Sequence, residues 1–458
     1  MKMSYPLKSA MLVICLAINT ANANDGYPAE ELTTATAPDS GNYGDLGQAR
    51  FINGKYVAPL LTLPELSAEE IATLATRRSA QVRGGKPLQI GVGRDLIKQI
   101  AHTGAENVDT DVTWRLLNFS VASKGARALR LGFALEYPKA AGGLTLRFGG
   151  SDGEVFEVAG SELTEDAVQW SPIVTGEVVR VEISVARGYA LSQAGLKLLN
   201  ISHFDVDPAA PESEIMAKLV DPAVGCNREH VACRAAPPPG FRSTANAVAK
   251  MVYTQSDGSW ECTGTLLNNS NTPKKHLLWS AAHCIVNQTV ANTLETYWFF
   301  ERTNCDVNDA NGRKKYLSGG AFLRYRNVGR DMLLLELKAA PPAGAVYAAW
   351  SSDLINSTGT PVEVIHHPYG FEKAYTLGTV VGLNYGDRDV PGPLYEVEVS
   401  VGKTAYGSSG AGLFTKTATG VYQLRGGHVG GKTRESCTND YYSRFGDVYN
   451  EIKSYFGP

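Results

Sequence analysis

Short runs in which apolar and polar residues alternate occupy residues 110–205. Four of these runs lie at 113–119, 128–133, 144–148 and 178–185. A period of two places successive side chains on opposite faces of a strand, and turn-forming residues separate the runs. Several short strands at this spacing predict a β-sandwich in the first half of the chain.

Residues 245–458 also show the pattern of short strands. The clearest runs lie at 248–253, 263–267, 332–337 and 394–399, and the set favours a β-barrel or a pair of barrels. A helix signal stands apart at 65–80, where Ser67 and Glu70 have the spacing of a capping box. The expected fold class is therefore mainly β.

The N-terminus has the pattern of a secretory signal peptide. Lys2 and Lys8 precede an apolar run at 10–18, and the small residues at 21–23 match a cleavage signal. The run is too short to span a bilayer as a mature helix. We therefore expect residues 1–23 to be removed and the protein to be secreted, without a membrane span.

Changes in composition divide the rest of the chain. Residues 205–222 are rich in proline and acidic residues, which fits an exposed linker or processing region open to proteolysis, and Lys218 lies within it. We expect a β-rich N-terminal domain at 24–204 and a second domain at 223–458.

Cysteines and charge narrow the function classes. Without Cys15 of the signal peptide, the six remaining cysteines lie in the second half: Cys226, Cys233, Cys262, Cys284, Cys305 and Cys437. An even number in a secreted chain predicts three disulfides and leaves their pairing open. No Cys-x-x-Cys pair occurs, so we expect no zinc site. We expect no cofactor, and the scattered acidic residues leave calcium binding open. The net charge of −3 gives no electrostatic basis for binding nucleic acid.

Three motifs could carry chemistry. An apolar run at 277–282 ends in His283 beside Cys284, Asp331 leads directly into a strand-like run, and small residues surround Ser409. The small residues let the backbone turn sharply and present amides to a substrate oxygen. Each motif is weak alone, but the order His, Asp, Ser within one cysteine-rich domain is typical of nucleophilic catalysis.

These motifs resemble those of the chymotrypsin-like serine proteases. The resemblance covers about 225–458 and implies a C-terminal double β-barrel of chymotrypsin type, here preceded by a β-sandwich-like N-terminal pro-domain. By the same resemblance Ser409 is the nucleophile, His283 the general base and Asp331 the residue that fixes the imidazole tautomer. The backbone N–H groups of Gly407 and Ser409 would form the oxyanion hole.

Two positions depart from the trypsin pattern. Ser408 stands where zymogen-activated members have an aspartate that pairs with the new N-terminal amine, so we do not expect activation by that ion pair. Lys403 stands where trypsin-like enzymes carry the carboxylate of the S1 pocket. Asp440 is the acidic residue that could replace it.

The Asp-Tyr-Tyr segment, the Gly-Ser-Ser-Gly turn and the six cysteines resemble those of the bacterial lysyl endopeptidases. This resemblance implies cleavage after lysine with Asp440 as the S1 carboxylate, and places His428 and Gly427 in the edge strand of the pocket. It also implies the disulfides Cys226–Cys437, Cys233–Cys305 and Cys262–Cys284. The expected partners are peptide or protein substrates and the chain's own pro-domain, and we expect a monomer.

Alternatives remain open at this point, the first being cleavage after both lysine and arginine. Glutamyl endopeptidases bind an acidic side chain with a histidine of the same edge strand, and His428 with Lys403 could do so. A secreted, non-catalytic binding protein on a protease scaffold is the rival from another class. The N-terminal domain could be a pro-domain that covers the cleft until the linker is cut, or a binding domain that stays attached.

Overall fold

The structure of the chain is a computed structural model, which describes residues 30–31, 49–53, 59–80, 87–99, 106–110, 114–135, 144–163, 168–186, 196–216, 227–306, 314–386, 390, 392–431 and 439–458. The predicted signal peptide, Lys218, Cys226 and Cys437 lie outside the described residues.

The N-terminal domain is a β-sandwich. One sheet has the order β2–β5–β11–β7–β8, with β4 on β5. Its strands are β2 (Pro59–Leu63), β4 (Glu106–Thr110), β5 (Trp114–Ser123), β7 (Thr145–Gly149), β8 (Val155–Ala159) and β11 (Val178–Ala186). The facing sheet contains β3 (Leu88–Gln99), β6 (Ala128–Leu135), β9 (Gln169–Trp170), β10 (Val174–Thr175) and β12 (Leu196–Phe204). Apolar side chains of both sheets, such as Phe119, Phe133 and Phe148, form one buried core.

Helix α1 (Ala68–Ala80) begins with the predicted capping box. The Glu70 N–H donates to Ser67 Oγ at 3.2 Å, and the Ser67 N–H donates to Glu70 Oε2 at 2.7 Å. Two N–H groups that the helix cannot satisfy internally are thereby paired. The helix signal and its start are confirmed.

The last part of the chain forms a closed six-stranded barrel, in which β24 pairs with both β23 and β25. The ring consists of β24 (Ala374–Tyr385), β23 (Pro361–His366), β26 (Gly412–Lys416), β27 (Tyr422–Gly431), β28 (Asn439–Tyr442) and β25 (Leu394–Val401). Shorter strands β13 (Glu229–His230) and β22 (Ala349–Trp350) pair with β24 and β27, and β1 (Glu30–Glu31) pairs with β21 (Val346–Tyr347).

The preceding barrel is open. Its strands, in spatial order, are β18 (Lys315–Leu317), β17 (Glu295–Trp298), β14 (Val248–Gln255), β15 (Gly258–Leu267), β16 (Leu277–Ser280), β20 (Met332–Leu337) and β19 (Ala321–Asn327). Within the described part of the chain, no pairing joins β18 to β19. The mainly β, two-barrel fold class is confirmed, with a half-barrel in place of the first closed barrel. Four short helices complete the half: α2 (Glu212–Met216), α3 (Phe241–Ala245), α4 (Gln288–Ala291) and α5 (Tyr449–Ile452).

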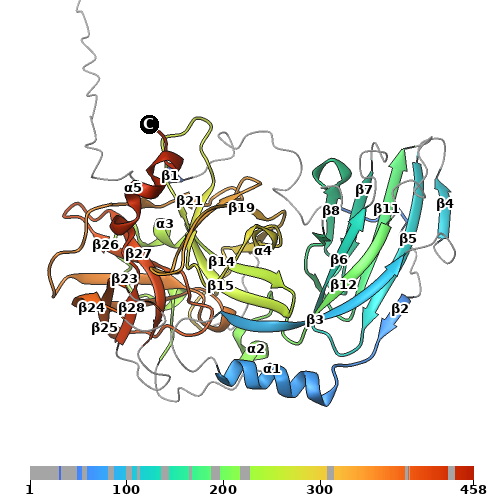
Figure 1. The fold of residues 1–458 in the computed structure, drawn as a ribbon, viewed down its shortest axis with the longest axis horizontal. Coiled ribbons are helices and arrows are strands. Elements are labelled where there is room, and N and C mark those ends of the chain that lie inside the picture. The colour runs from blue at the N-terminus through green and yellow to red at the C-terminus, as the bar shows by residue number, and fades with distance from the viewer. Residues whose placement is uncertain are drawn as a thin grey trace, which may run out of the picture.

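Strand β3 joins the two halves into one sheet. It pairs with β12 of the sandwich and with β15 of the half-barrel, where Ser259 lies opposite Gly91 and Glu261 opposite Leu88. Figure 1 shows β3 crossing from the sandwich to the barrels. Arg130 of the sandwich is 1% exposed and donates to the Thr293 carbonyl of the barrel half at 2.6 Å. The interface is therefore both a backbone pairing and a buried polar contact.

The segment from residue 205 to 216 is not an exposed linker. Val206, Ala210 and Ile215 are buried in an apolar cluster with barrel residues. Glu212 accepts hydrogen bonds from Arg228, His230 and Arg302 at 2.6–2.9 Å. The acidic residue Glu212 is therefore paired with basic side chains of the barrel half and does not need exposure to solvent. Residues 217–222 of the predicted processing region lie outside the described part.

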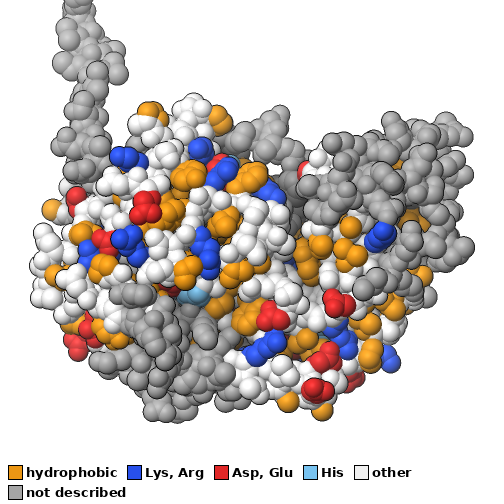
Figure 2. Space-filling view, viewed as in Figure 1, with side chains coloured by type: hydrophobic (Ala, Val, Ile, Leu, Met, Phe, Trp, Pro, Cys, Tyr) orange, Lys and Arg blue, Asp and Glu red, His pale blue; other side chains and the backbone are white. Residues whose placement is uncertain are grey.

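The face drawn in Figure 2 carries basic and acidic side chains in mixed positions, as the small net charge predicts. Among the described residues, no helix is long and apolar enough to cross a membrane.

Candidate active site

His283 and Asp331 meet at one end of the paired strands β16 and β20. Ser280, the last residue of β16, lies opposite Leu333 near the start of β20. The residues just after β16 and just before β20 are therefore neighbours. Asp331 Oδ2 lies 2.7 Å from His283 Nδ1, and Oδ1 accepts the His283 backbone N–H at 2.9 Å. The carboxylate thus holds both the ring and the backbone of His283.

This arrangement determines which ring nitrogen can act. Asp331 is 3% exposed, and a buried carboxylate needs such donors to be tolerated. A carboxylate at Nδ1 keeps the proton there and leaves Nε2 with its lone pair. Nε2 of His283 has no hydrogen-bond partner in the structure. The site therefore holds an imidazole ready to accept a proton at Nε2.

A disulfide ties the histidine segment to the neighbouring strand. Cys284 is bonded to Cys262 of β15, and both are fully buried. Cys233 and Cys305 form a second disulfide. These are two of the three pairs named from the resemblance. The atoms of Cys262, His283 and Cys284 lie within 4.8 Å of one another, but the two sulfurs are bonded to each other and offer no thiolate to a metal.

Ser409 lies in a tight turn against β15. The Thr263 N–H donates to the Ser409 carbonyl at 2.9 Å, and Thr263 Oγ1 donates to the Gly407 carbonyl at 2.8 Å. Gly407 has φ 81° and Gly410 has φ 83°, a region that L side chains rarely adopt. A Cβ on Gly410 would lie 2.1 Å from Ser280 Oγ. The turn therefore depends on glycine at both positions and packs against the end of the histidine strand.

The structure brings the Ser409 turn beside the histidine segment without a hydrogen bond between their side chains. Cys284 Sγ lies 4.0 Å from the Ser409 carbonyl oxygen, whereas His283 Nε2 has no partner. Contacts between nucleophile and base are often long in unliganded sites and shorten when substrate binds. Ser409 is 1% exposed and His283 is partly exposed.

Asp440 lies in the closed barrel on β28, opposite Gly431 of β27. It is 6% exposed. Oδ2 accepts hydrogen bonds from Thr404 Oγ1 at 2.7 Å and from the Tyr442 hydroxyl at 3.3 Å. Its other oxygen, Oδ1, lies 3.8 Å from His428 Nε2. The Oδ2 atom of the carboxylate is thus held by two hydroxyl groups.

His428 and Gly427 lie on β27, beside the Ser409 turn. The Gly410 N–H donates to the His428 carbonyl at 2.8 Å. The His428 ring is 3% exposed and has no hydrogen-bond partner at either nitrogen. A Cβ on Gly427 would lie 2.7 Å from Trp279 Nε1, so this glycine permits the close approach of the indole. Lys403, the residue at the trypsin-like S1 position, is 8% exposed.

Sequence reasoning missed three residues that shape the site. Thr263 holds the Ser409 turn, Thr404 holds the Asp440 carboxylate, and His366 contacts Ser408. Thr404 directly follows Lys403 and lies five positions before Ser409, so its nearness to the expected S1 region could have been noticed. Thr263 and His366 reach the turn only through strand pairing, which has no local sequence signal.

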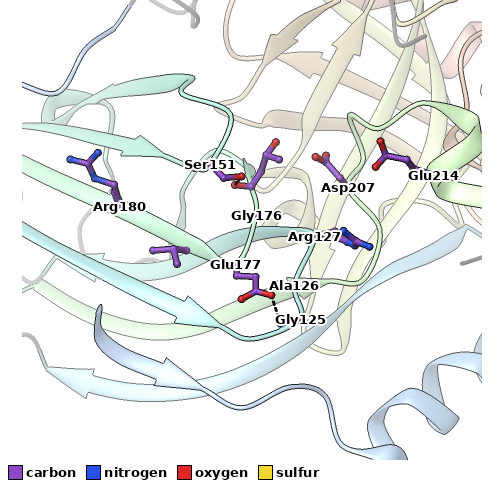
Figure 3. A pocket seen from close by; sticks show the side chains of 12 residues that line it. Gly125, Ala126, Arg127, Ser151, Gly176, Glu177, Arg180, Asp207 and Glu214 are labelled. Carbon is purple, nitrogen blue, oxygen red and sulfur yellow. Dashed lines mark hydrogen bonds between the residues drawn. The ribbon is translucent and has the colours of Figure 1, made fainter. Parts of the chain in front are cut away.

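A separate cavity lies at the edge of the sandwich (Figure 3). Arg127, Glu177 and Arg180 line it, together with Asp207 and Glu214 of the joining segment. His283, Asp331 and Ser409 do not line this cavity. It is therefore distinct from the candidate active site.

The fold and the histidine–aspartate site define a protease of the chymotrypsin type. The family model described as lysyl endopeptidase, C-terminal domain matches residues 220–449, and the lysyl endopeptidase N-terminal domain matches residues 62–205. A lysyl endopeptidase of Pseudomonas aeruginosa is 35% identical over 466 residues, which cover 98% of each chain. The chain belongs to the lysyl endopeptidase family and is a protease.

More distant similarities were also found. Secreted RxLR effector protein 73 of Plasmopara viticola is 26% identical over 238 residues, covering 50% of this chain and 54% of that protein. The inactive form of the Rv3671c protease has a TM-score of 0.33 at 18% identity and covers 49% of this chain and 98% of its own. The active form from M. tuberculosis has a TM-score of 0.32 at 18% identity, covering 52% and 94%.

Proposed function

We propose that this protease is a secreted serine endopeptidase that cleaves peptide bonds after lysine. Ser409 is the nucleophile, His283 the general base and Asp331 the residue that orients the imidazole. The proposal rests mainly on the two-point hold of Asp331 on His283, at 2.7 Å on Nδ1 and 2.9 Å on the backbone N–H. That hold leaves Nε2 as the ring atom available for proton transfer.

The chemistry proceeds in two halves. Ser409 Oγ attacks the peptide carbonyl while its proton passes to His283 Nε2, and the backbone N–H groups of Gly407 and Ser409 receive the oxyanion. The imidazolium then gives this proton to the departing amine, which leaves an acyl-enzyme. Water repeats the sequence, and Ser409 Oγ recovers its proton when the carboxylic acid product leaves.

The Asp440 carboxylate supports a preference for lysine. Thr404 and Tyr442 both donate to Oδ2, and Oδ1 faces His428 with no hydrogen bond between them. A buried carboxylate attracts an ammonium and repels an acidic side chain, because both effects are stronger where water is excluded. The same carboxylate argues against the glutamyl alternative. The intact set of His283, Asp331 and Ser409 argues against a non-catalytic binding protein.

We further propose that the protein is made as a precursor, with a signal peptide at 1–23 and an N-terminal pro-region at 24–204. Cleavage in the processing region 205–222, at the residues that follow the buried segment 205–216, would cut the chain between the halves, with Lys218 as a site the enzyme itself could cut. N-terminal sequencing of the active secreted protein tests this proposal. A single N-terminus at residue 24 would contradict removal of the pro-region.

Cleavage-site profiling on a peptide library tests the reaction and its specificity together. We expect cleavage after lysine by the natural enzyme and none by the Ser409→Ala variant. Cleavage after glutamate would overturn the assignment of Asp440. Hydrolysis that persists in Ser409→Ala would overturn the catalytic roles.

A further inference from the structure

Ser408, the residue before the proposed nucleophile, makes a buried hydrogen-bonded contact with a histidine of the closed barrel. Its hydroxyl lies 2.8 Å from His366 Nδ1 and accepts the Ala405 N–H at 3.0 Å. Ser408 and His366 are both fully buried. This position is the one where an aspartate would have indicated activation by a new N-terminal amine.

His366 connects Ser408 to the strands of the closed barrel. It is the last residue of β23, and its Nε2 lies 3.0 Å from Thr376 Oγ1 on the paired strand β24. Burial and the neighbouring charge of His428 lower the pKa of His366 to about 3, although Asp440 opposes the shift. The ring is therefore neutral at any pH where a serine protease works.

Ser408 Oγ accepts the Ala405 N–H and has its own proton left to donate to His366 Nδ1. In that tautomer the neutral imidazole carries its hydrogen at Nε2 and donates it to Thr376 Oγ1, whereas in the other tautomer both directions are reversed. Each polar atom of the neutral histidine is thus satisfied, as a buried ring requires.

The same barrel segment holds the turn at a second point. Thr263 Oγ1 accepts the backbone N–H of His367 at 3.1 Å and donates to the Gly407 carbonyl at 2.8 Å. A Cβ on Gly407 would lie 2.8 Å from the His367 carbonyl oxygen. The end of β23 therefore contacts both residues that precede Ser409.

We propose that Ser408, His366 and Thr376 form a positioning network that holds the nucleophile turn in its working geometry. The inference rests on the proposed function, because it concerns the two N–H groups that flank Ser408, those of Gly407 and Ser409. Rotation of the peptide between Ser408 and Ser409 would turn the Ser409 N–H away from the oxyanion. A neutral serine–histidine–threonine chain takes the place of a charged N-terminal amine, so the turn is formed without cleavage of the chain.

The test uses the full-length protein and two variants that remove different links. Ser408→Ala removes the hydroxyl and both of its bonds, and Thr376→Val removes only the hydroxyl partner of His366 Nε2 while keeping the side-chain shape. We expect kcat on a lysyl peptide amide to fall by about 10- to 100-fold for Ser408→Ala, less than the full loss of an oxyanion donor. The fall should be smaller for Thr376→Val, and KM should change little for either. Ser408→Thr, which keeps the hydroxyl, should recover most of the lost rate.

A peptide aldehyde that ends in lysinal provides the readout that a purely structural role would not change. It forms a tetrahedral adduct whose oxygen occupies the oxyanion hole, so its inhibition constant should rise by the same factor by which kcat/KM falls. The inhibition constant of a cleaved peptide ending in lysine should not change. A Ser408→Ala enzyme with natural kcat and natural aldehyde inhibition would refute the network.

Ser123 offers a matched control. Its hydroxyl lies 2.8 Å from His203 Nδ1, both residues are buried, and they belong to the sandwich. Ser123→Ala should lower the Tm while leaving kcat unchanged, and an equal fall in kcat there would also refute the proposal.

If Ser408→Ala does not fold, the isosteric Thr376→Val decides by the same criteria. Ser409→Ala separates the two failures, because activity in that variant overturns the proposed function, whereas inactivity there with full activity in Ser408→Ala overturns only this inference.

Discussion

Asp331 Oδ1 and Oδ2 both accept hydrogen bonds from His283, one from the backbone and one from the ring. The residue that orients the imidazole therefore also holds the chain that carries it. Asp331 itself has φ 52°, an uncommon conformation for a residue with a side chain. The strand pairing of β16 with β20 on one side of it maintains this geometry.

Asp331→Asn is expected to lower kcat by about 10⁴-fold. An amide can still accept the backbone N–H of His283 with its oxygen, but its NH₂ group then faces Nδ1 and favours the wrong imidazole tautomer. The measurement is kcat on a lysyl peptide amide, with circular dichroism to show that the fold is retained. A loss of less than about tenfold would contradict the assigned role.

Asp440→Asn is expected to remove the preference for lysine. The amide keeps the size of the side chain and a partner for Thr404 but loses the negative charge, so kcat/KM for lysine should fall by about 100-fold or more, the cost of leaving a buried charge unpaired. Paired peptides with lysine or norleucine before the cleaved bond provide the comparison. The norleucine peptide should be cleaved at nearly the same rate by both enzymes, and an equal loss on both peptides would contradict a role in charge recognition.

The two disulfides found among the described residues should differ in their effects on stability and on activity. Loop-closure entropy predicts a cost of about 3 kcal/mol for removing Cys262–Cys284, which spans 22 residues, and about 4 kcal/mol for Cys233–Cys305, which spans 72. Alanine replacement of each pair, followed by thermal unfolding and kinetics, tests this. Only the pair beside His283 should lower kcat markedly, and the other pair should lower the Tm at least as much.

Glu212 should stabilise the protein in a pH-dependent manner. Burial by itself would raise the pKa of Glu212, but the hydrogen bond from His230 and the charge and hydrogen bonds of Arg228 lower it to about 2. Because the pKa is depressed on folding, the stabilisation is present above the unfolded value near pH 4.3 and is lost as the pH falls toward 2.

Glu212→Gln should accordingly lower the Tm at pH 7 by on the order of 5 °C. The difference from the natural protein should shrink between pH 4 and pH 2, where the carboxylate becomes protonated. Thermal unfolding at pH 7 and pH 3 measures this. A Tm difference that is the same at both values would show that the carboxylate charge does not matter there.

His203 provides an opposite pH dependence. Burial, followed by the charge of Arg94, lowers its pKa to about 4. The unfolded chain binds a proton near pH 6.5 and the folded chain does not, so stability should fall as the pH drops from 6.5 to 4. His203→Gln should reduce this slope in a plot of Tm against pH, and an unchanged slope would contradict the assignment.

The sequence predicted well what is local. The alternating runs are strands, the Ser67–Glu70 box starts α1, and Asp331 leads into β20. It could not predict contacts between distant segments, because strand pairing has no local signal beyond the pleat. The pairing of β3 with β15 and the contact of Ser408 with His366 are of this kind.

The acidic joining segment shows why composition misled. Proline and carboxylates favour exposure only when no cation faces them, and Glu212 meets Arg228, His230 and Arg302 in the folded protein. Those partners lie 16 to 90 residues further along the chain. Their approach follows from the fold of the barrels, which the segment's own residues do not reveal.

Strand β3 would keep the two halves together after the joining segment is cut. A single cut in the joining segment breaks one covalent bond but leaves Gly258 to Glu261 paired with β3. Dissociation of the sandwich would expose an unpaired edge of β15 on the barrel half. Unpaired strand edges promote aggregation. The barrel half produced alone from residue 223 should therefore aggregate unless another chain or a rearranged loop covers that edge. Co-expression of the two halves is the practical route to a soluble cleaved form.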